Sequence, residues 1–388
     1  MQVLIYGIGA VICAFLLTYL LTPAIRAFSI KIGAVDVPKD DRRMHSRAIP
    51  QAGGIGVFIS FVITTLVFGV PTSEMTAIWT GGLILIVVGV LDDIFDLNPL
   101  LKFIIQIIAA LTAVLQGVIV QEIFLFDRYI ELGWLSYPLT ILWIVALVNA
   151  FNLIDGLDGL SSGMCAISCI TLICVALMYG NVMQALIAAV LCGACLGFLP
   201  YNFYPARIFI GDTGAYFLGF VLAVISIEGV FKISAVISFV LPVMIFALPL
   251  LDTVMSFFRR LIHGKAPFSS DKKHLHHRLI ALGLSQRHAV LIMYAVSGLF
   301  GIIAIIYTDL VLIGERIIKA LILLFAVTVI CLIDYELLRH HSGVSPKMPN
   351  HVIQDDDDNN DNGDEDKGSK DEDKSENNRE TEKESDTE

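Results

Sequence analysis

The chain has 388 residues, of which 56% are hydrophobic and only 16% charged, and its mean hydropathy is +0.76. Soluble proteins carry about 25% charged residues, so this composition excludes a water-soluble enzyme and indicates a protein embedded in a lipid bilayer. The net charge of -11 comes from the end of the chain, where residues 355–388 contain 17 Asp and Glu but 5 Lys and Arg.

Apolar runs of the length of membrane spans follow one another along the chain. A helix needs about 20 apolar residues to cross a bilayer, and the runs are continuously apolar, which favours helices over a membrane β-barrel. We predict an all-α polytopic membrane protein with about 11 transmembrane helices over residues 1–338, followed by a disordered acidic tail over residues 339–388. The predicted spans are 3–22, 50–70, 77–91, 101–119, 138–151, 162–179, 182–200, 214–230, 235–256, 289–307 and 317–334.

Basic residues are distributed unequally between the two sides of this predicted bundle. The connections on one side, together with the tail, contain 22 Lys and Arg, whereas the connections on the other side contain 4. Because positive charge is retained on the cytoplasmic side, we predict that the N-terminus is outside and the tail cytoplasmic.

The first polar cluster follows the third predicted span, in the segment VLDDIFDLNPLLK. A helix ending here would place Asp93 and Asp96 on one face. Carboxylates beside Lys102 suit a divalent cation and a phosphate, and they would equally suit a proton acceptor beside a Mg²⁺ site. A polar turn that ends a helix would also explain these residues if the segment stood alone.

The second cluster is NAFNLIDGLDGLSSG, with Asn149, Asn152, Asp155 and Asp158 three residues apart. In a helical or 3₁₀-like turn these four side chains would share a face. The serines at 161–162 would then cap the next helix, whose first N–H groups can hold an anion. The regular spacing favours a ligand site over a plain loop.

The third cluster is YNFYPARIFIGDTGAYFLG, in which Asp212 begins the eighth predicted span. A carboxylate is favourable at a helix N-terminus for electrostatic reasons alone. It is also a suitable Mg²⁺ ligand when a diphosphate supplies further oxygens. Asn202 and Phe209 would hold and stack a nucleobase.

Two basic segments complete the predicted cytoplasmic side. In RRLIHGKAPFSSDKKHLHHRL, His274, His276 and His277 stand among lysines and arginines, which favours a diphosphate over a zinc ion. In KDDRRMHSRAIPQAGGIG, His45 stands among arginines that ordinary positive-inside sorting also explains. Asp252, within the ninth predicted span, is expected to pair with one of the arginines at 259–260.

With all five segments in this order, the region from about residue 30 to 280 resembles the polyprenyl-phosphate N-acetylhexosamine-1-phosphate transferases of glycosyltransferase family 4. The family transfers an amino-sugar 1-phosphate from a UDP-sugar to undecaprenyl phosphate and releases UMP. The resemblance implies Mg²⁺ as cofactor, with Mn²⁺ able to replace it, and an active site on the cytoplasmic face of the bacterial inner (plasma) membrane. It implies catalytic roles for Asp92, Asp93, Lys102, His274, His276 and His277, substrate contacts for Asn152, Asp155, Asp158, Asn202, Phe209 and His45, and metal ligation by Asp212 and Asn149.

Two branches of this family differ in the sugar that they transfer. One accepts UDP-GlcNAc and starts teichoic acid, common antigen or O-antigen synthesis; the other accepts UDP-MurNAc-pentapeptide in peptidoglycan synthesis. The sequence HLHH and the acidic Asp96 resemble the first branch, because the second typically has three consecutive histidines and a lysine. We therefore expect UDP-GlcNAc, undecaprenyl phosphate and the bilayer as partners, and no nucleic acid. A homodimer is compatible with this expectation.

The sequence leaves alternatives open for the reaction mechanism and for the class of protein. The lipid phosphate attacks the sugar-side phosphorus either directly or after a covalent aspartyl-phosphate forms at Asp92 or Asp93. An ion-coupled secondary transporter or a membrane scaffold is the alternative class. Carboxylates at helix ends, rather than near the bilayer midplane, argue against a transporter.

Overall fold

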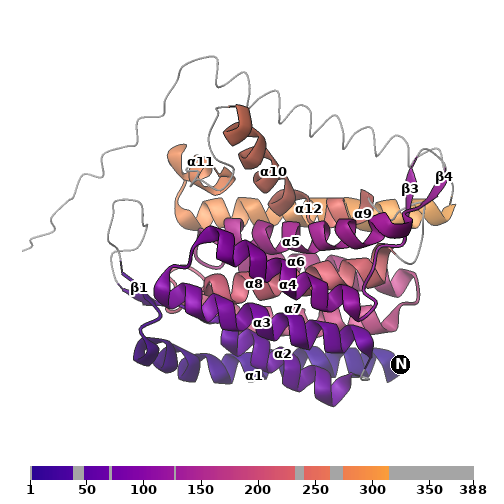
Figure 1. Ribbon diagram of the computed structural model, residues 1–388. Coiled ribbons are helices and arrows are strands. Elements are labelled where there is room, and N and C mark those ends of the chain that lie inside the picture. The colour runs from indigo at the N-terminus through magenta and orange to yellow at the C-terminus, as the bar shows by residue number, and fades with distance from the viewer. Residues whose placement is uncertain are drawn as a thin grey trace, which may run out of the picture. The chain divides into compact units, whose positions relative to one another are not determined.

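The computed structural model describes residues 2–37, 48–69, 72–125, 128–231, 240–262 and 274–313. His45, the eleventh predicted span and the acidic tail lie outside these ranges. Within them the chain forms a bundle of helices that run broadly alongside one another, with two small β-ribbons at its ends (Figure 1). The helices are α1 (Gln2–Ile32), α2 (Gly54–Phe68), α3 (Ser73–Phe95), α4 (Pro99–Leu115), α5 (Ser136–Ile154), α6 (Leu160–Met178), α7 (Val182–Asn202), α8 (Gly211–Ser226), α9 (Val240–Ile245), α10 (Ala247–Ile262), α11 (Leu275–Ala281) and α12 (Gln286–Ile313).

The shorter elements connect these helices. The antiparallel ribbon of β1 (Val35–Asp36) and β2 (Ile49–Pro50) lies between α1 and α2, with Val35 opposite Pro50. A second ribbon, β3 (Glu122–Leu125) and β4 (Arg128–Glu131), and the 3₁₀ turn η1 (Gly133–Leu135) precede α5. The π-helical turn η2 (Ile227–Phe231) extends α8.

The prediction of an all-α polytopic membrane protein agrees with this architecture. Seven of the described helical segments are long and apolar enough to cross a membrane, and three shorter ones are apolar over 10–17 residues. The count of eleven spans and the orientation of the termini stay predictions. The fifth span extends into both flanks of 138–151, as Ser136–Ile154, and α1 continues to Ile32 through Pro23.

The ninth predicted span differs from its expectation, because it is divided into α9 and α10. Pro249 stands in the first turn of α10, where its missing N–H removes no helical hydrogen bond. In Figure 1, α10 is inclined to the helices beside it. This break directs the C-terminal half of the span toward the segment that contains the histidines.

Helix α8 is the centre of the bundle, since all of its residues except Asp212 are buried. A helix that is apolar all round needs neighbours on every side, and α2, α3 and α5 all pack against α8. Two glycines allow the closest approaches: Gly54 of α2 meets the backbone of Gly214, and Gly89 of α3 meets the backbone of Thr213. These crossings bring the ends of α2 and α3 to the N-terminus of α8.

We expect Gly54→Ala to lower the free energy of unfolding by about 2 kcal/mol, because overpacking a close-packed interior costs about 1–3 kcal/mol. An added Cβ would lie 2.2 Å from the Cα and N atoms of Gly214, which are backbone atoms and cannot rotate away. Thermal unfolding of the detergent-purified protein measures the effect. Gly298→Ala is the matched control, since nothing lies within 4 Å of its added Cβ. Equal unfolding temperatures for both variants would contradict the close crossing of α2 and α8.

Candidate active site

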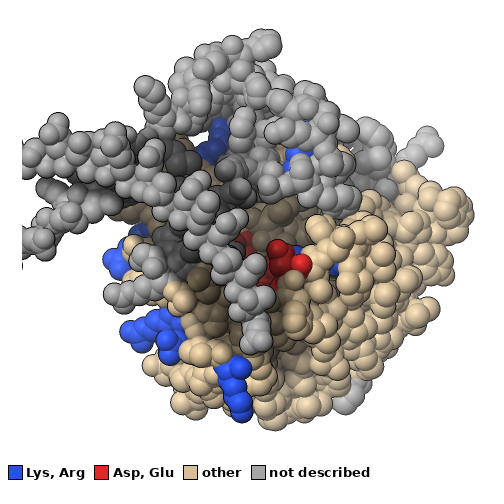
Figure 2. Space-filling model, turned by 60° about the vertical axis from the view of Figure 1, so that its left-hand side comes forward, with Lys and Arg blue, Asp and Glu red and all other residues tan. Residues whose placement is uncertain are grey.

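A pocket of about 800 Å³ opens among the connections at one end of the bundle. Figure 2 shows acidic side chains recessed in a hollow and basic side chains on the surface around it. The lining includes Asp155, Asp158, Asn202, Phe209, Asp212 and His277, together with Arg26 and Arg207. The second and third polar clusters of the sequence therefore contribute to one pocket.

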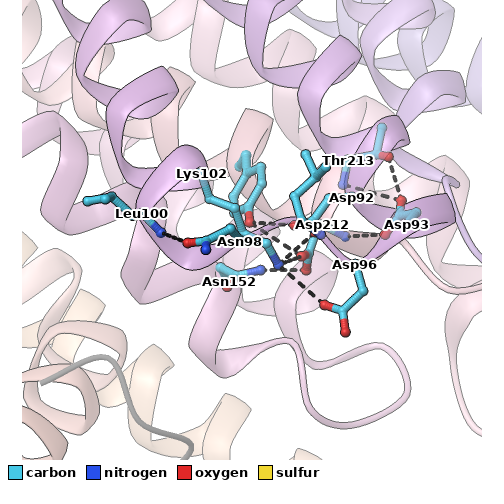
Figure 3. A network of polar contacts seen from close by, with 11 residues as sticks. Asp92, Asp93, Asp96, Asn98, Leu100, Lys102, Asn152, Asp212 and Thr213 are labelled. Atoms are coloured by element: carbon cyan, nitrogen blue, oxygen red, sulfur yellow. Dashed lines mark hydrogen bonds and ion pairs between the residues drawn. The ribbon is translucent and has the colours of Figure 1, made fainter. Parts of the chain in front are cut away.

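Asp212 lies at the centre of a network that joins four helices (Figure 3). Asn152 of α5 donates from Nδ2 to Asp212 Oδ1 over 2.6 Å. The hydroxyl of Tyr216 is 3.3 Å from Asp212 Oδ2 and 3.0 Å from Asp92 Oδ2. Lys102 Nζ of α4 lies 2.6 Å from Asp92 Oδ1 and 3.6 Å from Asp212 Oδ2. One ammonium group thus bridges carboxylates of α3 and α8.

Asp93 faces a different neighbour, the N-terminus of α8. Its carboxylate accepts the N–H of Asp212 over 3.0 Å, and the N–H and hydroxyl of Thr213 over 3.4 Å and 2.5 Å. A carboxylate in this position satisfies the first N–H groups of the helix and interacts favourably with its dipole. Asp93 therefore fixes the end of α8 that carries Asp212.

The prediction that Asp93 and Asp96 share a helix face is wrong. Helix α3 ends at Phe95, and Asp96 adopts the left-handed conformation with φ of 51°. Its fully exposed carboxylate reaches Lys102 at 3.9 Å. The i, i+3 relation requires a continuous helix, and the chain leaves the helix one residue too early.

The prediction that all four Asn and Asp residues of the second cluster share a face is also wrong. Asn149 Nδ2 donates to Gln106 Oε1 of α4 over 2.6 Å and to the carbonyl of Val145 over 2.8 Å. Asn152, one turn later, is the residue that reaches Asp212. Helix α5 ends at Ile154, so Asp155 and Asp158 belong to the turn that lines the pocket.

The two serines of that cluster do not cap α6. Ser161 donates its hydroxyl to Asp155 Oδ1 over 2.6 Å, and Ser162 donates to Asn202 Oδ1 over 2.7 Å. The residue before α6 is Gly159, whose φ of 78° favours glycine. The hydroxyls instead hold side chains of the pocket in place.

Burial raises the pKa of Asp155 to about 7, and the charges of Asp93 and Asp158 act in the same direction. The hydrogen bond from Ser161 opposes this effect. Asp155 therefore exchanges its proton near neutral pH, which limits the negative charge of the pocket.

The segment between α7 and α8 forms one wall of the pocket. Asp158 Oδ2 accepts the N–H of Ala206 over 2.8 Å, and Asn202 Nδ2 donates to the carbonyl of Ile208 over 3.1 Å. Arg207 and Phe209 line the pocket, whereas Ile208 between them is fully buried. Asn202, only 2% exposed, thus holds the wall that presents Phe209.

The three histidines have different surroundings. Among them, His277 lines the pocket. His276 is 1% exposed, its ring packs on Gly156, and burial together with His277 lowers the pKa of His276 to about 3, so it is neutral at pH 7. His274 Nδ1 lies 2.9 Å from Asp252 Oδ2. Of the three, His277 is the one in the pocket lining, whereas His274 and His276 are buried, and a contact of these histidines with phosphates stays a prediction.

Sequence reasoning overlooked Tyr216, Thr213 and Gln106. Tyr216 follows Asp212 by four residues, so the helical period was a usable signal. Gln106 and Thr213 carry no such signal, because their contacts depend on how the helices cross.

The fold and the pocket define a class: a polytopic membrane protein with a polar site, rich in carboxylates, at one end of a helix bundle. Comparisons with known proteins narrow this class. Residues 75–230 match the model of glycosyl transferase family 4. The chain is 42% identical over 301 residues to the probable undecaprenyl-phosphate N-acetylglucosaminyl 1-phosphate transferase of Bacillus subtilis, covering 76% of this chain and 84% of that protein. The chain belongs to glycosyl transferase family 4, which confirms the resemblance seen in its sequence.

Other relatives are similar over the same extent. The decaprenyl-phosphate N-acetylglucosaminephosphotransferase of Mycolicibacterium smegmatis is 35% identical, covering 76% of this chain and 81% of that protein. The undecaprenyl-phosphate alpha-N-acetylglucosaminyl 1-phosphate transferase of Salmonella typhi is 31% identical, covering 77% and 83%.

Proposed function

We propose that this protein transfers GlcNAc-1-phosphate from UDP-GlcNAc to undecaprenyl phosphate, giving undecaprenyl-diphospho-GlcNAc and UMP. The names of relatives from three bacteria support transfer of an N-acetylglucosamine phosphate to a polyprenyl phosphate, and two of these names specify undecaprenyl phosphate. The observation that carries it is the bridge from Lys102 to Asp92 and Asp212 at the edge of a pocket large enough for a nucleotide-sugar. The active site lies on the cytoplasmic face of the bacterial plasma membrane, where the basic connections are predicted.

The donor atoms at Asp212 fit Mg²⁺. Within the described residues, no group of three or more His, Cys, Asp or Glu side chains converges on one point, so these residues form no closed metal cage. Mg²⁺ usually takes one or two carboxylates and fills its remaining positions with water and substrate phosphates. We propose Asp212 as the carboxylate ligand. The amide of Asn152 lies beside it, whereas that of Asn149 is turned toward Gln106, so the geometry favours Asn152 as the second ligand. Bound Mg²⁺ would neutralise the diphosphate and improve UMP as a leaving group.

The protein must bring together two anionic substrates that repel each other. Lys102 supplies a fixed positive charge at the edge of the site, and its side chain is 20% exposed, so a phosphate can reach it. Phe209 provides an apolar ring for the base, on the wall that Asp158 and Asn202 hold. These groups would hold both reactants in place for the transfer.

We propose direct attack of the lipid phosphate rather than an aspartyl-phosphate intermediate. Asp93 accepts three hydrogen bonds from the start of α8, which lowers its nucleophilicity and holds it in place. Asp92 accepts from Leu97 N–H, Lys102 and Tyr216. A phosphate monoester is mostly dianionic at pH 7, so the acceptor itself needs no strong base.

A radiolabel transfer assay tests this function. Purified protein in undecaprenyl-phosphate vesicles with Mg²⁺ is expected to move label from the GlcNAc phosphate of UDP-GlcNAc into lipid and to release UMP in equal amount. UDP-MurNAc-pentapeptide is expected to be inactive. Transfer from that donor alone would assign the protein to the peptidoglycan branch. If neither donor led to release of UMP, the proposed transferase function would be refuted. A sugar-phosphoryl protein trapped without lipid would refute direct attack.

A further inference from the structure

Asp252 is a buried carboxylate that the proposed chemistry does not use. It lies in α10, is 8% exposed, and its described partners both come from the start of α11. One oxygen lies 2.9 Å from His274 Nδ1, and the other accepts the N–H of Leu275 over 2.8 Å. An ionisable group buried in a membrane protein is costly unless it is paired, so the pairing of Asp252 with the start of α11 calls for a role.

The contacts of Asp252 lead from α10 to the pocket through the three histidines. The ring of His274 stacks parallel to that of His276, with centroids 5.7 Å apart and an interplanar angle of 1°. His276 packs its ring on Gly156, where an added Cβ would meet Nε2 at 2.4 Å. The ring of His277 lies 4.2 Å from that of His276 and lines the pocket.

The two oxygens of Asp252 fix both the position and the orientation of this segment. The bond to Leu275 N–H holds the first residue of a helix of only seven residues, which has little stability of its own. The contact with His274 Nδ1 sets the tautomer and the angle of the ring on which His276 stacks. A side-chain amide could accept only one of these two hydrogen bonds, because its nitrogen has no acceptor lone pair.

Building on the proposed function, we propose that Asp252 is a positioning residue: it anchors the start of α11 so that His277 is held against the nucleotide-sugar pocket. Asp252 itself touches neither substrate. Its contribution is to the binding of UDP-GlcNAc, through the placement of His277, and not to the reaction of the lipid phosphate.

A double-mutant cycle between Asp252→Asn and His277→Asn tests this role. Asp252→Asn is expected to raise KM for UDP-GlcNAc about tenfold, in line with the loss of a hydrogen bond to a charged group. Its kcat and its KM for undecaprenyl phosphate should change less than about twofold. In the His277→Asn background, Asp252→Asn should change KM for UDP-GlcNAc less than about twofold, because the anchored group is already gone. Glu122→Gln, an exposed carboxylate of β3, is the control for the substitution itself.

His274→Gln removes the other half of the pair and should give the same rise in KM, with no further rise when combined with Asp252→Asn. If Asp252→Asn does not fold, the double-mutant cycle with His277→Asn is measured with His274→Gln in its place. An unchanged KM in either variant, or equal losses in both His277 backgrounds, would overturn the positioning role. Failure of the proposed function looks different: the unmodified protein would neither transfer GlcNAc-1-phosphate nor bind UDP-GlcNAc in calorimetry.

Discussion

Asp212→Asn is expected to lower the rate of GlcNAc-1-phosphate transfer by about 10²–10³-fold, the loss seen when one preorganised electrostatic contact is removed from an active site. The amide has nearly the same shape as the carboxylate, so the packing at the start of α8 should survive. What is lost is the negative charge that Asn152 and Lys102 surround. The proposed Mg²⁺ site loses its carboxylate ligand at the same time.

Initial rates measured over a range of Mg²⁺ concentrations check this expectation. The residual activity of Asp212→Asn should no longer rise with Mg²⁺ in the range where the unmodified protein responds. Glu131→Gln, an exposed carboxylate of β4, controls for a general effect of removing an acid. Membrane insertion and the unfolding temperature should stay near those of the unmodified protein. Normal Mg²⁺-dependent turnover would discard Asp212 as the metal ligand.

The sequence was most informative where a signal is local. Hydropathy located α3 through α8 to within a few residues, because twenty apolar residues in a row have few other structures available. The polar clusters were found for the same reason, since each interrupts an apolar background. The ends of helices were harder, as at Asp96, because one left-handed residue redirects the side chains that follow.

The side-chain contacts between different helices could not be predicted from local sequence patterns. Asn149 and Asn152 are the same residue type one turn apart, and only the position of Gln106 on α4 separates their roles. The run of histidines likewise reads as one basic group, yet burial against Gly156 makes His276 neutral and Asp252 holds His274. Such differences arise from helix crossings that no spacing in the chain encodes.

Lys102→Gln is the second substitution expected to have a large effect, a fall in kcat of about 10²-fold. Lys102 balances the carboxylates of Asp92 and Asp212, and without it these two carboxylates would lose the ammonium group that bridges them where the anionic substrates meet. The side chain of Asp92 is only 1% exposed, so its charge would also lose its closest partner. Breaking such a pair costs stability as well as activity.

Stability and activity together separate this role from a purely structural one. Lys102→Gln should unfold at a lower temperature without Mg²⁺, and adding Mg²⁺ should raise that temperature more than in the unmodified protein, because the cation would then be the main counter-charge for the carboxylates. Lys102→Arg keeps the charge and should restore the stability while recovering only part of kcat, since a guanidinium is larger and planar. If Lys102→Gln kept an unchanged kcat, the lysine would be a structural partner of Asp92 and the phosphate-binding role would be lost.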